Sequence, residues 1–451
     1  MPVDTEHEQY KKYAPLWGKC RACIEGEDRV KAEGQRFLPE IDGQDAERYA
    51  AYKNRALFFN ATDRTVEALL GFLFRKPPLL SPDDSDFFDS LSPTSATFDI
   101  FIKEISEEVI SVGRVGVLCD VVGGVPSLLK YRAEDIINWR ENMIVLREHI
   151  DVFGDDEFKP DDKIQYRVLD LFEGFYRQRV FQNKNDDDNI WIVVQEIFPT
   201  SNGLRLETRP GAEESVAFIP FILINKDDTG LAIEKPVLID LVNVNLSHYR
   251  SYADIEQGRH YTSLPTPWVA GFDPSQTELK IGAGVAWVSE NADAKAGFLE
   301  FTGQGLGSLE KALEGKEAMM AILGARILEA QKAAVEATDT HKIRNSGEQS
   351  ILSKIAHTID AGMTWIIKVC ADWRKISSDD INVELNKDYA VTTVDAALVA
   401  AMFGALQGAA VSFDTWFYNL KKWEMIQPGQ TLDDELNQIA ARNPMTGGSE
   451  E

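Results

Sequence analysis

The chain has 451 residues, of which 44% are hydrophobic and 10% aromatic, enough apolar material for one large core or several smaller ones. That composition argues against disorder along most of the chain. Asp and Glu outnumber Lys and Arg by 73 to 47, and the formal net charge is -26. Tight, sequence-independent binding of nucleic acid needs Lys and Arg at the phosphates, so this charge argues against a protein that grips DNA. It is compatible with plain solubility and with letting DNA pass.

Cysteine is rare, with four residues in the chain, and no signal-like segment starts it, so we expect a reducing, cytoplasmic setting. Cys20 and Cys23 have the spacing of half a zinc site. The sequence has no second pair and no His-x3-His partner, so we expect neither a metal nor a cofactor. The longest apolar runs, such as residues 218–224, are shorter than the roughly 20 residues that a bilayer-spanning helix needs, and membrane insertion is not expected.

The N-terminal part has helical periodicity. Residues 10–24 and 98–112 each carry apolar side chains three and four positions apart, which predicts two amphipathic helices. Residues 45–74 follow the same pattern and predict one long helix, which the following Pro-Pro pair ends. Gly113 is the predicted stop of the helix at 98–112.

Strands dominate next. Residues 114–122 form a β-branched run with which residues 128–131 could pair. Further strands are predicted at residues 143–150, 165–172, 175–182, 190–197, 204–208 and 218–224, with hairpin signals at Glu173-Gly174 and Asn202-Gly203. Acidic clusters at residues 155–157, 161–162 and 186–188 are expected in the loops. The alternative of a calcium loop lacks the spacing and the glycine of an EF-hand.

Helices return in the second half. Pro236 opens a predicted helix that ends near Gly258, and a glycine-containing, β-leaning segment follows at residues 268–301. Five more helices are predicted, at residues 306–335, 346–375, 393–408, 412–422 and 432–440. The fold class is therefore α+β, with a mainly antiparallel β-rich block in the middle.

No catalytic motif accompanies these elements. The glycines at residues 303–307 lack the spacing of a dinucleotide fingerprint, and the sequence contains no nucleotide-binding P-loop. The six histidines are scattered, and no G-x-S-x-G elbow surrounds any serine. We therefore expect a protein that is not an enzyme. A metal-dependent nuclease that uses scattered carboxylates remains a less favoured alternative.

Six segments carry a resemblance to a known family: residues 52–78, 131–139, 219–221, 238–241, 247–251 and 346–350. Residues 70–77 read Leu-Gly-Phe-Leu-Phe-Arg-Lys-Pro, and residues 346–350 read Ser-Gly-Glu-Gln-Ser. In this order the segments resemble the portal (head-to-tail connector) proteins of tailed bacteriophages, in particular a divergent group often labelled as phage proteins of unknown function. The resemblance covers most of the chain.

The resemblance implies a portal-like architecture of wing, stem and crown. Residues 1–44 would be an N-terminal arm, and 45–134 a wing α/β region. Residues 135–230 would be a β-rich acidic block that includes the clip, and 231–262 a stem helix. Residues 263–376 would hold a channel β segment and long wing helices with the tunnel loop, and 377–451 a crown-like helical region.

The same resemblance suggests functional residues. The tunnel loop would contain Asp339, Thr340, His341, Lys342, Arg344 and Asn345. Its basic residues could touch phosphates transiently, although an ordinary solvated helix connection is an equal alternative. Asn245, Tyr249, Arg250 and Tyr252 would lie on the stem helix that lines the channel. The helix at 45–74 has more apolar width than one neighbour would cover, so we expect Phe58, Phe59, Phe72 and Phe74 at a subunit interface, with an intramolecular core as the alternative.

The implied function is structural. Identical copies, usually twelve, would close into a ring at one capsid vertex of the virion, after assembly in the host cytoplasm. Double-stranded DNA would pass through non-specifically during packaging and ejection. The implied partners are the terminase large subunit, a head-tail adaptor, and the major capsid and scaffolding proteins. Another head-completion or adaptor protein of the virion is the nearest alternative.

Overall fold

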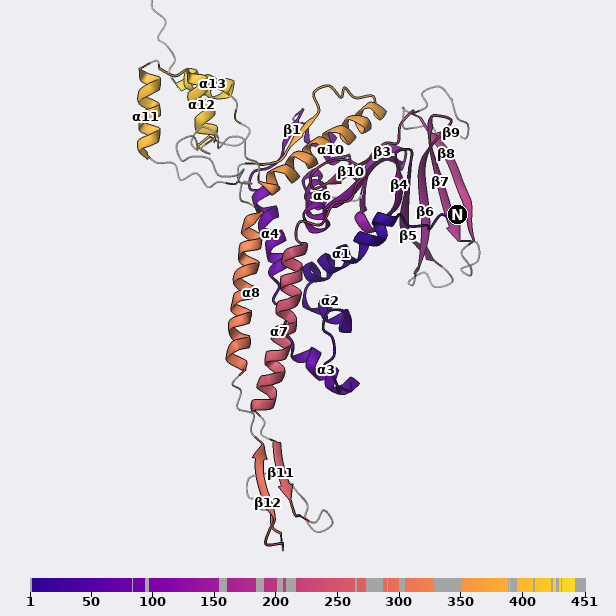
Figure 1. Cartoon of the computed structure of the whole chain (residues 1–451). Coiled ribbons are helices and arrows are strands. Elements are labelled where there is room, and N and C mark those ends of the chain that lie inside the picture. Colours follow the sequence, from indigo (N-terminus) through magenta and orange to yellow (C-terminus); the bar gives the residue numbers. More distant parts are fainter. Residues whose placement is uncertain are drawn as a thin grey trace, which may run out of the picture. The chain divides into compact units, whose positions relative to one another are not determined.

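The computed structural model describes residues 2–82, 84–93, 97–153, 160–183, 190–200, 206–207, 216–263, 266–272, 287–289, 291–299, 305–327, 350–387, 389, 396–408, 410–422, 425–426, 430 and 432–442. The chain divides into two compact units, residues 1–387 and residues 388–451. Figure 1 shows the helices and strands of both units.

A three-stranded antiparallel sheet forms the centre of the first unit. Its order is β10 (Phe221–Asn225), β2 (Arg114–Val122) and β3 (Val125–Arg132). Helices α6 (Phe98–Val112) and α10 (Ile351–Trp373) pack on it, so β2 is buried along most of its length. The backbone of β2 approaches its neighbours closely at Gly116, where a Cβ would meet Phe221 Cζ at 2.3 Å and Ile136 Cδ1 at 2.9 Å.

Helix α6 has the bounds that its sequence pattern predicts. The Thr97 hydroxyl accepts a hydrogen bond from the Ile100 amide at 3.4 Å, which caps the first turn. Gly113 ends the helix in the left-handed region, at φ 85°, which a residue with a Cβ rarely adopts. The chain then enters β2 directly, and the predicted order of helix and strand is confirmed.

A six-stranded antiparallel sheet follows in chain order. Its strands are β4 (Ile136–Arg140), β5 (Met143–Phe153), β6 (Pro160–Phe172), β7 (Phe175–Asn183), β8 (Trp191–Pro199) and β9 (Leu206–Glu207). Glu173 and Gly174 connect β6 to β7 with φ values of 52° and 85°, as the predicted tight turn requires. The antiparallel β block is thus confirmed, and the α+β class with it. Strand β4 was not predicted, and residues 218–224 contribute β10 to the other sheet.

A buried polar network joins the two sheets. Arg167 on β6 donates to Asp120 Oδ2 on β2 at 2.6 Å and to Glu148 Oε1 on β5 at 2.7 Å. Gln178 on β7 donates to the other oxygen of Asp120 at 3.0 Å. A buried charge is tolerated only when it is paired, and here the guanidinium and both carboxylates have partners.

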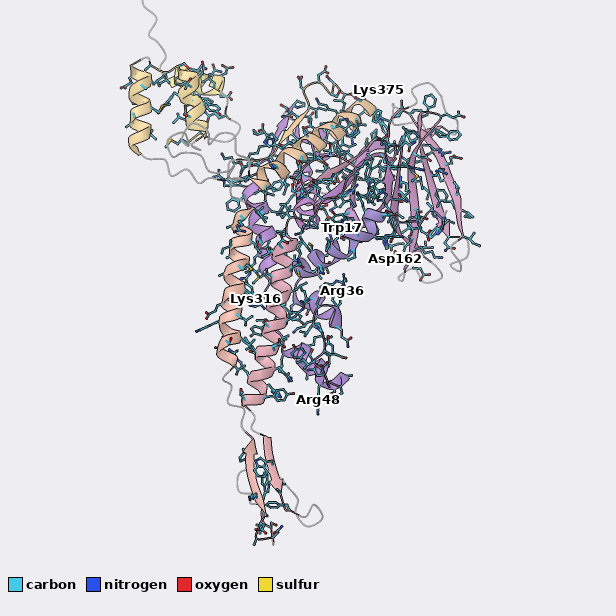
Figure 2. The ribbon with its side chains drawn as sticks, in the orientation of Figure 1. Trp17, Arg36, Arg48, Asp162, Lys316 and Lys375 are labelled. Atoms are coloured by element: carbon cyan, nitrogen blue, oxygen red, sulfur yellow. The ribbon has the colours of Figure 1, made fainter. Side chains whose placement is uncertain are left out.

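The remaining elements of the first unit surround this core. They are α1 (Glu8–Glu25), α2 (Glu27–Ala32), η1 (Gly34–Arg36), α3 (Ala46–Arg55), α4 (Ala61–Leu73), β1 (Leu79–Ser81), α5 (Ser85–Asp89), η2 (Ala133–Asp135), α7 (Ile239–Ser263), β11 (Thr266–Ala270), β12 (Lys295–Leu299), α8 (Leu306–Arg326) and β13 (Asn382–Glu384). Strands β1 and β13 pair with each other and were not predicted. Figure 2 shows the side chains on this framework.

Two sequence predictions are wrong here. Residues 45–74 form two helices, α3 and α4, instead of one, because residues 56–60 leave the helical path and turn Phe58 into the core. The side chain of Asn245 fixes that break by donating to the Phe59 carbonyl at 2.7 Å. The acidic pair at residues 161–162 lies in β6 and not in a loop, where Asp162 pairs with His149 across the strands at 3.0 Å.

The second unit is helical in its described part. It contains α11 (Ala396–Gln407), α12 (Phe413–Lys422) and α13 (Leu432–Arg442), close to the predicted ranges. The rings of Phe403 and Trp416 lie 5.9 Å apart and connect α11 to α12. Among the residues described in either unit, no helix combines the length and the apolar character that spanning a membrane requires.

Gly116 provides a test of the sheet packing. We expect Gly116→Ala to lower the free energy of unfolding by about 1–3 kcal/mol, because the added methyl has to displace Phe221 or Ile136. Gly71→Ala is the control: Gly71 lies in α4 with nothing within 4 Å of an added Cβ, so the same substitution should stabilise by roughly 0.5–1 kcal/mol. Urea unfolding of both variants measures the contrast, and an equal effect at the two positions would contradict the close approach at β2.

Candidate functional site

Two long helices, α7 and α8, lie side by side in opposite directions (Figure 1). Arg259 near the end of α7 donates to Glu310 near the start of α8 at 2.9 Å. Further along, Lys316 of α8 donates to the Ser247 carbonyl at 3.0 Å and to Ser251 Oγ at 2.6 Å. Because positions that rise along α8 pair with positions that fall along α7, the two helices are antiparallel.

The contact between α7 and α8 combines close packing with polar links. A Cβ at Gly258 would lie 2.7 Å from Leu306 Cδ2, so the helices approach each other there. His248 Nε2 lies 3.2 Å from Glu317 Oε1, and the imidazole is almost fully buried. Burial lowers the pKa of His248, and the hydrogen bond with Glu317 opposes that shift. Burial also lowers the pKa of Lys316, which Figure 2 labels on α8.

The opposite side of α7 is covered by the N-terminal helices of the same chain. Asn245 accepts from Thr62 Oγ1 of α4 at 2.8 Å, and Tyr249 packs edge-on against Phe58 with ring centroids 6.0 Å apart. Tyr52 of α3 donates to Asp254 of α7 at 2.7 Å. These contacts position α7 between α8 and the segment of α3 and α4.

The predicted stem-helix residues all lie on α7, but they do not share one exposed face. Asn245 and Tyr249 are buried within the subunit and hold α7 in place, so neither can line a channel. Arg250 is exposed and donates to the Phe37 carbonyl at 2.8 Å. Tyr252 is half-buried and stacks on His248, with ring centroids 6.3 Å apart.

The predicted interface phenylalanines divide in the same way. Phe58 is buried in its own subunit against Tyr249, so its assignment to a subunit interface is wrong. Phe59, Phe72 and Phe74 are half-buried, which leaves part of each ring available. The sequence-based prediction could not tell the buried phenylalanine from the half-buried ones, because it placed all four on one continuous helix.

The structure reveals an apolar surface on α8 that the sequence reasoning missed. Met319 and Ile322 are 51% and 54% exposed, one turn apart on the side away from α7. Gly315, one turn before Met319, has nothing within 4 Å of an added Cβ. Met320, which turns toward the subunit, is 3% exposed. We call Gly315, Met319 and Ile322 the outer face of α8. The spacing of the apolar residues alone predicts a helix with apolar side chains on two sides, but it does not show which side stays exposed.

A two-stranded hairpin is inserted between α7 and α8. Strands β11 and β12 pair antiparallel, with Trp268 opposite Gly297 and Pro267 opposite Phe298. Trp268 and Phe298 are 43% and 57% exposed. Among the described residues no third strand joins either edge. Because α7 and α8 are antiparallel, the end of α7 and the start of α8, which the hairpin connects, lie at the same end of the pair.

Other predicted features fall outside the described residues. The structure does not describe the acidic clusters at residues 155–157 and 186–188. It also does not describe the tunnel-loop candidates, which are Asp339, Thr340, His341, Lys342, Arg344 and Asn345. The described part of the chain contains no group of three His, Cys, Asp or Glu side chains arranged to hold a metal ion.

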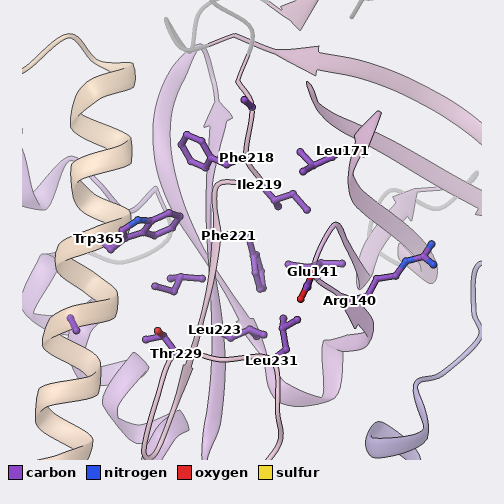
Figure 3. Close-up of a pocket in the computed structure, with 14 residues that line it drawn as sticks. Arg140, Glu141, Leu171, Phe218, Ile219, Phe221, Leu223, Thr229, Leu231 and Trp365 are labelled. Atoms are coloured by element: carbon purple, nitrogen blue, oxygen red, sulfur yellow. The ribbon is translucent and has the colours of Figure 1, made fainter. Parts of the chain in front are cut away.

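Figure 3 shows a mainly apolar pocket of the first unit, of about 580 Å³, between β10, the six-stranded sheet and α10. Phe218 and Trp365 flank it with ring centroids 6.0 Å apart. Arg140, Glu141 and Thr229 provide the polar side chains of its lining, and the rest of the lining is apolar. Its lining therefore holds one guanidinium, one carboxylate and one hydroxyl among apolar groups.

Comparison with known proteins gives limited likeness. The family described as a domain of unknown function (DUF4055) matches residues 237–374, which run from the start of α7 to the end of α10. Among curated proteins none matches the chain.

Solved structures of gene transfer agent particles are similar over most of the chain but at low scores. A chain of the native particle's virion is 11% identical, covering 86% of this chain and 96% of that one with a TM-score of 0.38. A chain of the neck of the empty particle, computed with C6 symmetry, is 10% identical over the same shares, also with a TM-score of 0.38. A chain of the native neck, computed with C12 symmetry, is 11% identical, covering 78% and 86%, with a TM-score of 0.34. These scores are too low to establish a shared fold or role.

His248 makes the contact between α7 and α8 sensitive to pH. Its folded-state pKa lies below the ordinary value of 6.5, so the unfolded chain binds the proton first as the pH falls. The stability that the neutral His248 side chain contributes is therefore present above pH 6.5, the unfolded-state pKa, and is lost as the pH falls from there toward the lower folded-state pKa. We expect the fall in urea midpoint between about pH 8 and about pH 5.5 to be smaller in His248→Gln than in the unsubstituted protein.

His260→Gln is the control for this pH experiment, because His260 is an exposed histidine on the same helix. The urea midpoint of His260→Gln should change between the two pH values as much as that of the unsubstituted protein. An unchanged slope in His248→Gln would show that the buried imidazole does not govern the pH response of the helix pair.

Proposed function

We propose that this chain is the subunit of a portal in a phage-like particle. Identical copies close into a ring at one vertex of the capsid, and double-stranded DNA passes through the ring during packaging and ejection. The ring docks the terminase large subunit and later a head-tail adaptor, among major capsid and scaffolding proteins. In this proposal the chain is a passive conduit in the virion and catalyses no reaction.

The outer face of α8 is the observation on which the proposal chiefly rests. Two large apolar side chains, Met319 and Ile322, are each more than half exposed on a helix whose other side is fixed to its own subunit by Lys316. Adjacent exposed apolar side chains on a surface helix favour contact with another protein surface. A second copy that presents a different face gives a head-to-tail contact, and such contacts close into a ring when the rotation allows it.

The hairpin β11–β12 is a second element that a neighbouring copy would complete. An isolated two-stranded hairpin is at best marginally stable in water, and this one exposes Trp268 and Phe298. Its position in the chain, between antiparallel α7 and α8, also makes it a candidate docking segment for terminase or an adaptor. The six-stranded sheet of the acidic block, which the resemblance assigns to the clip, is the other candidate.

Charge fits a conduit. Each copy adds a formal charge of -26, so a ring of copies carries a large negative field that counterions only partly screen. DNA phosphates that are repelled do not adhere to the wall. Because the sequence contains no nucleotide-binding P-loop, the work of moving DNA comes in this proposal from the separate terminase motor.

Negative-stain imaging of the purified protein tests the proposal. Annular particles with a central hole are expected, and a compact monomer that persists at high concentration would count heavily against a portal. Ile322→Glu should lower the population of rings by about tenfold or more, because the ring would bury an unpaired charge. Ile322→Val, which keeps the side chain apolar, is the control. Circular dichroism should show that both variants remain folded, since the side chain is exposed in the single subunit.

A second substitution tests the hairpin. We expect Phe298→Asp to leave the unfolding midpoint of the subunit unchanged, because the ring of Phe298 is mostly exposed. Rings should then require a protein concentration about tenfold higher, because the apolar contact between copies is lost. Light scattering over a dilution series measures this shift against Phe298→Tyr. Identical dilution curves for the two variants would exclude the hairpin from the contact between copies.

A further inference from the structure

A cavity of about 880 Å³ lies between the N-terminal segment of the chain and the six-stranded sheet. Val145 of β5, Val168 of β6 and Arg179 of β7 stand opposite one another in neighbouring strands. Side chains in such a cross-strand row share one face of the sheet, and these three line the cavity together. Sites for small organic molecules usually have about 300–1,000 Å³, so the cavity has the size of a ligand site.

The N-terminal segment forms one wall of this cavity. The His7 amide donates to the Ile137 carbonyl at 2.9 Å, and Asn138 Nδ2 donates to the Thr5 carbonyl at 2.8 Å. The rings of His7 and Trp139 are stacked, with centroids 4.3 Å apart. These contacts within the subunit hold the wall against β4, so the cavity is formed before any ligand enters.

Aromatic rings make up much of the lining. Trp139, Phe181 and Trp191 all border the cavity. Tyr166 packs edge-on against Trp191 with ring centroids 4.7 Å apart, and the guanidinium of Arg179 lies 5.4 Å from the centroid of Phe181. Flat apolar walls favour a ligand with an aromatic or other apolar group, because binding removes the apolar surfaces of both from water.

The charge of the lining is opposite to that of the chain. The lining contains two guanidinium groups, Arg140 and Arg179, and in the described part of the chain no Asp or Glu side chain belongs to it. The chain as a whole has a formal net charge of -26. Arg179 is partly balanced by Asp170, which lies 2.6 Å away. Arg140 is exposed and contacts Met143 Sδ at 3.3 Å, so its charge is available to an anion.

A third guanidinium group lies next to the ring of Trp139. Arg114, at the start of β2, is 1% exposed, and its guanidinium carbon is 4.4 Å from the centroid of that ring. Among the described residues, none of its three guanidinium nitrogens has a hydrogen-bond acceptor. Burial lowers the pKa of Arg114 to about 9, which still leaves the group charged at neutral pH. A buried charge without a partner is costly, so an anion bound near Trp139 would offset part of that cost.

We propose that this cavity binds an organic anion in which a carboxylate is joined to an aromatic or other apolar group. The carboxylate pairs with Arg140 and Arg179, and the apolar group lies among the aromatic rings. The source of this chemistry is a free aromatic carboxylate or a peptide segment with Glu beside an aromatic residue. A carboxylate fits better than a phosphate, because the net negative charge of the chain repels a dianion more strongly than a monoanion. This site goes beyond the portal proposal, and its occupation does not depend on ring formation.

Isothermal titration calorimetry of the full chain tests the site with two pairs of probes. One pair is 3-phenylpropionate and 3-phenylpropionamide, and the other is the capped tripeptides Glu-Phe-Glu and Gln-Phe-Gln. We expect the carboxylate of at least one pair to bind about tenfold or more tightly than its amide, because guanidinium groups form charge-assisted hydrogen bonds with carboxylates. The pair that shows the larger contrast identifies the source of the ligand. Equal affinities within both pairs would overturn the proposal, as would tighter binding of phenyl phosphate than of either carboxylate.

Four variants locate the binding. Arg140→Gln and Arg179→Gln should each raise the Kd of the preferred carboxylate about tenfold, because each removes a charged donor. Arg177→Gln is the matched control: Arg177 lies on the same strand as Arg179 and also pairs with Asp170, at 2.8 Å, but it does not line the cavity. Arg114→Met should raise the Kd several-fold while the unfolding midpoint stays the same or rises, because an unpaired buried charge is removed. Equal weakening by Arg177→Gln and Arg179→Gln would show that surface charge in general attracts the probe and would overturn the site.

Discussion

The burial of α7 between two sets of partners is the constraint on which the arrangement of the first unit depends. On one side Lys316 reaches across from α8 to the α7 backbone at Ser247. On the other side Asn245 accepts from Thr62 and donates to the Phe59 carbonyl. A buried amide whose hydrogen bonds are satisfied permits few alternative positions for the helix, because any shift would leave polar groups without partners. The same hydrogen bonds of Asn245 therefore fix both the position of α7 and the break between α3 and α4.

This constraint also determines which surfaces remain for other molecules. With one side of α8 fixed to α7, the outer face of Gly315, Met319 and Ile322 is left exposed. The polar network around Arg167 likewise occupies part of the six-stranded sheet, where Arg167 of β6 binds Asp120 of β2. In the portal proposal the subunit meets its neighbours through what these internal contacts leave free, while the acidic composition keeps DNA from adhering.

Helices, strands and turns that depend on interactions between neighbouring residues were predicted correctly. The helix at 98–112, its stop at Gly113, the strand at 114–122 and the turn at Glu173-Gly174 depend on caps, β-branched runs and positive φ, which act over a few residues. Predictions that required knowledge of distant partners were wrong. Phe58 was assigned to a subunit interface but packs on Tyr249, and Asp162 was placed in a loop but pairs with His149 within the sheet. Strand β4 was missed because its residues lie between a 3-10 turn and a short hairpin, where alternation is brief.

The sequence by itself determined the α+β class, most of the helices and strands, the acidic charge and the lack of a nucleotide-binding loop. These properties follow from composition and from interactions between residues close in the chain. Only the tertiary structure decided which apolar faces are buried and that α8 is the antiparallel partner of α7. The physical reason is that an amphipathic pattern shows that a face must be covered but not by what. The covering partner can lie far away along the chain, as Thr62 does from Asn245, and is selected by shape and by paired polar groups.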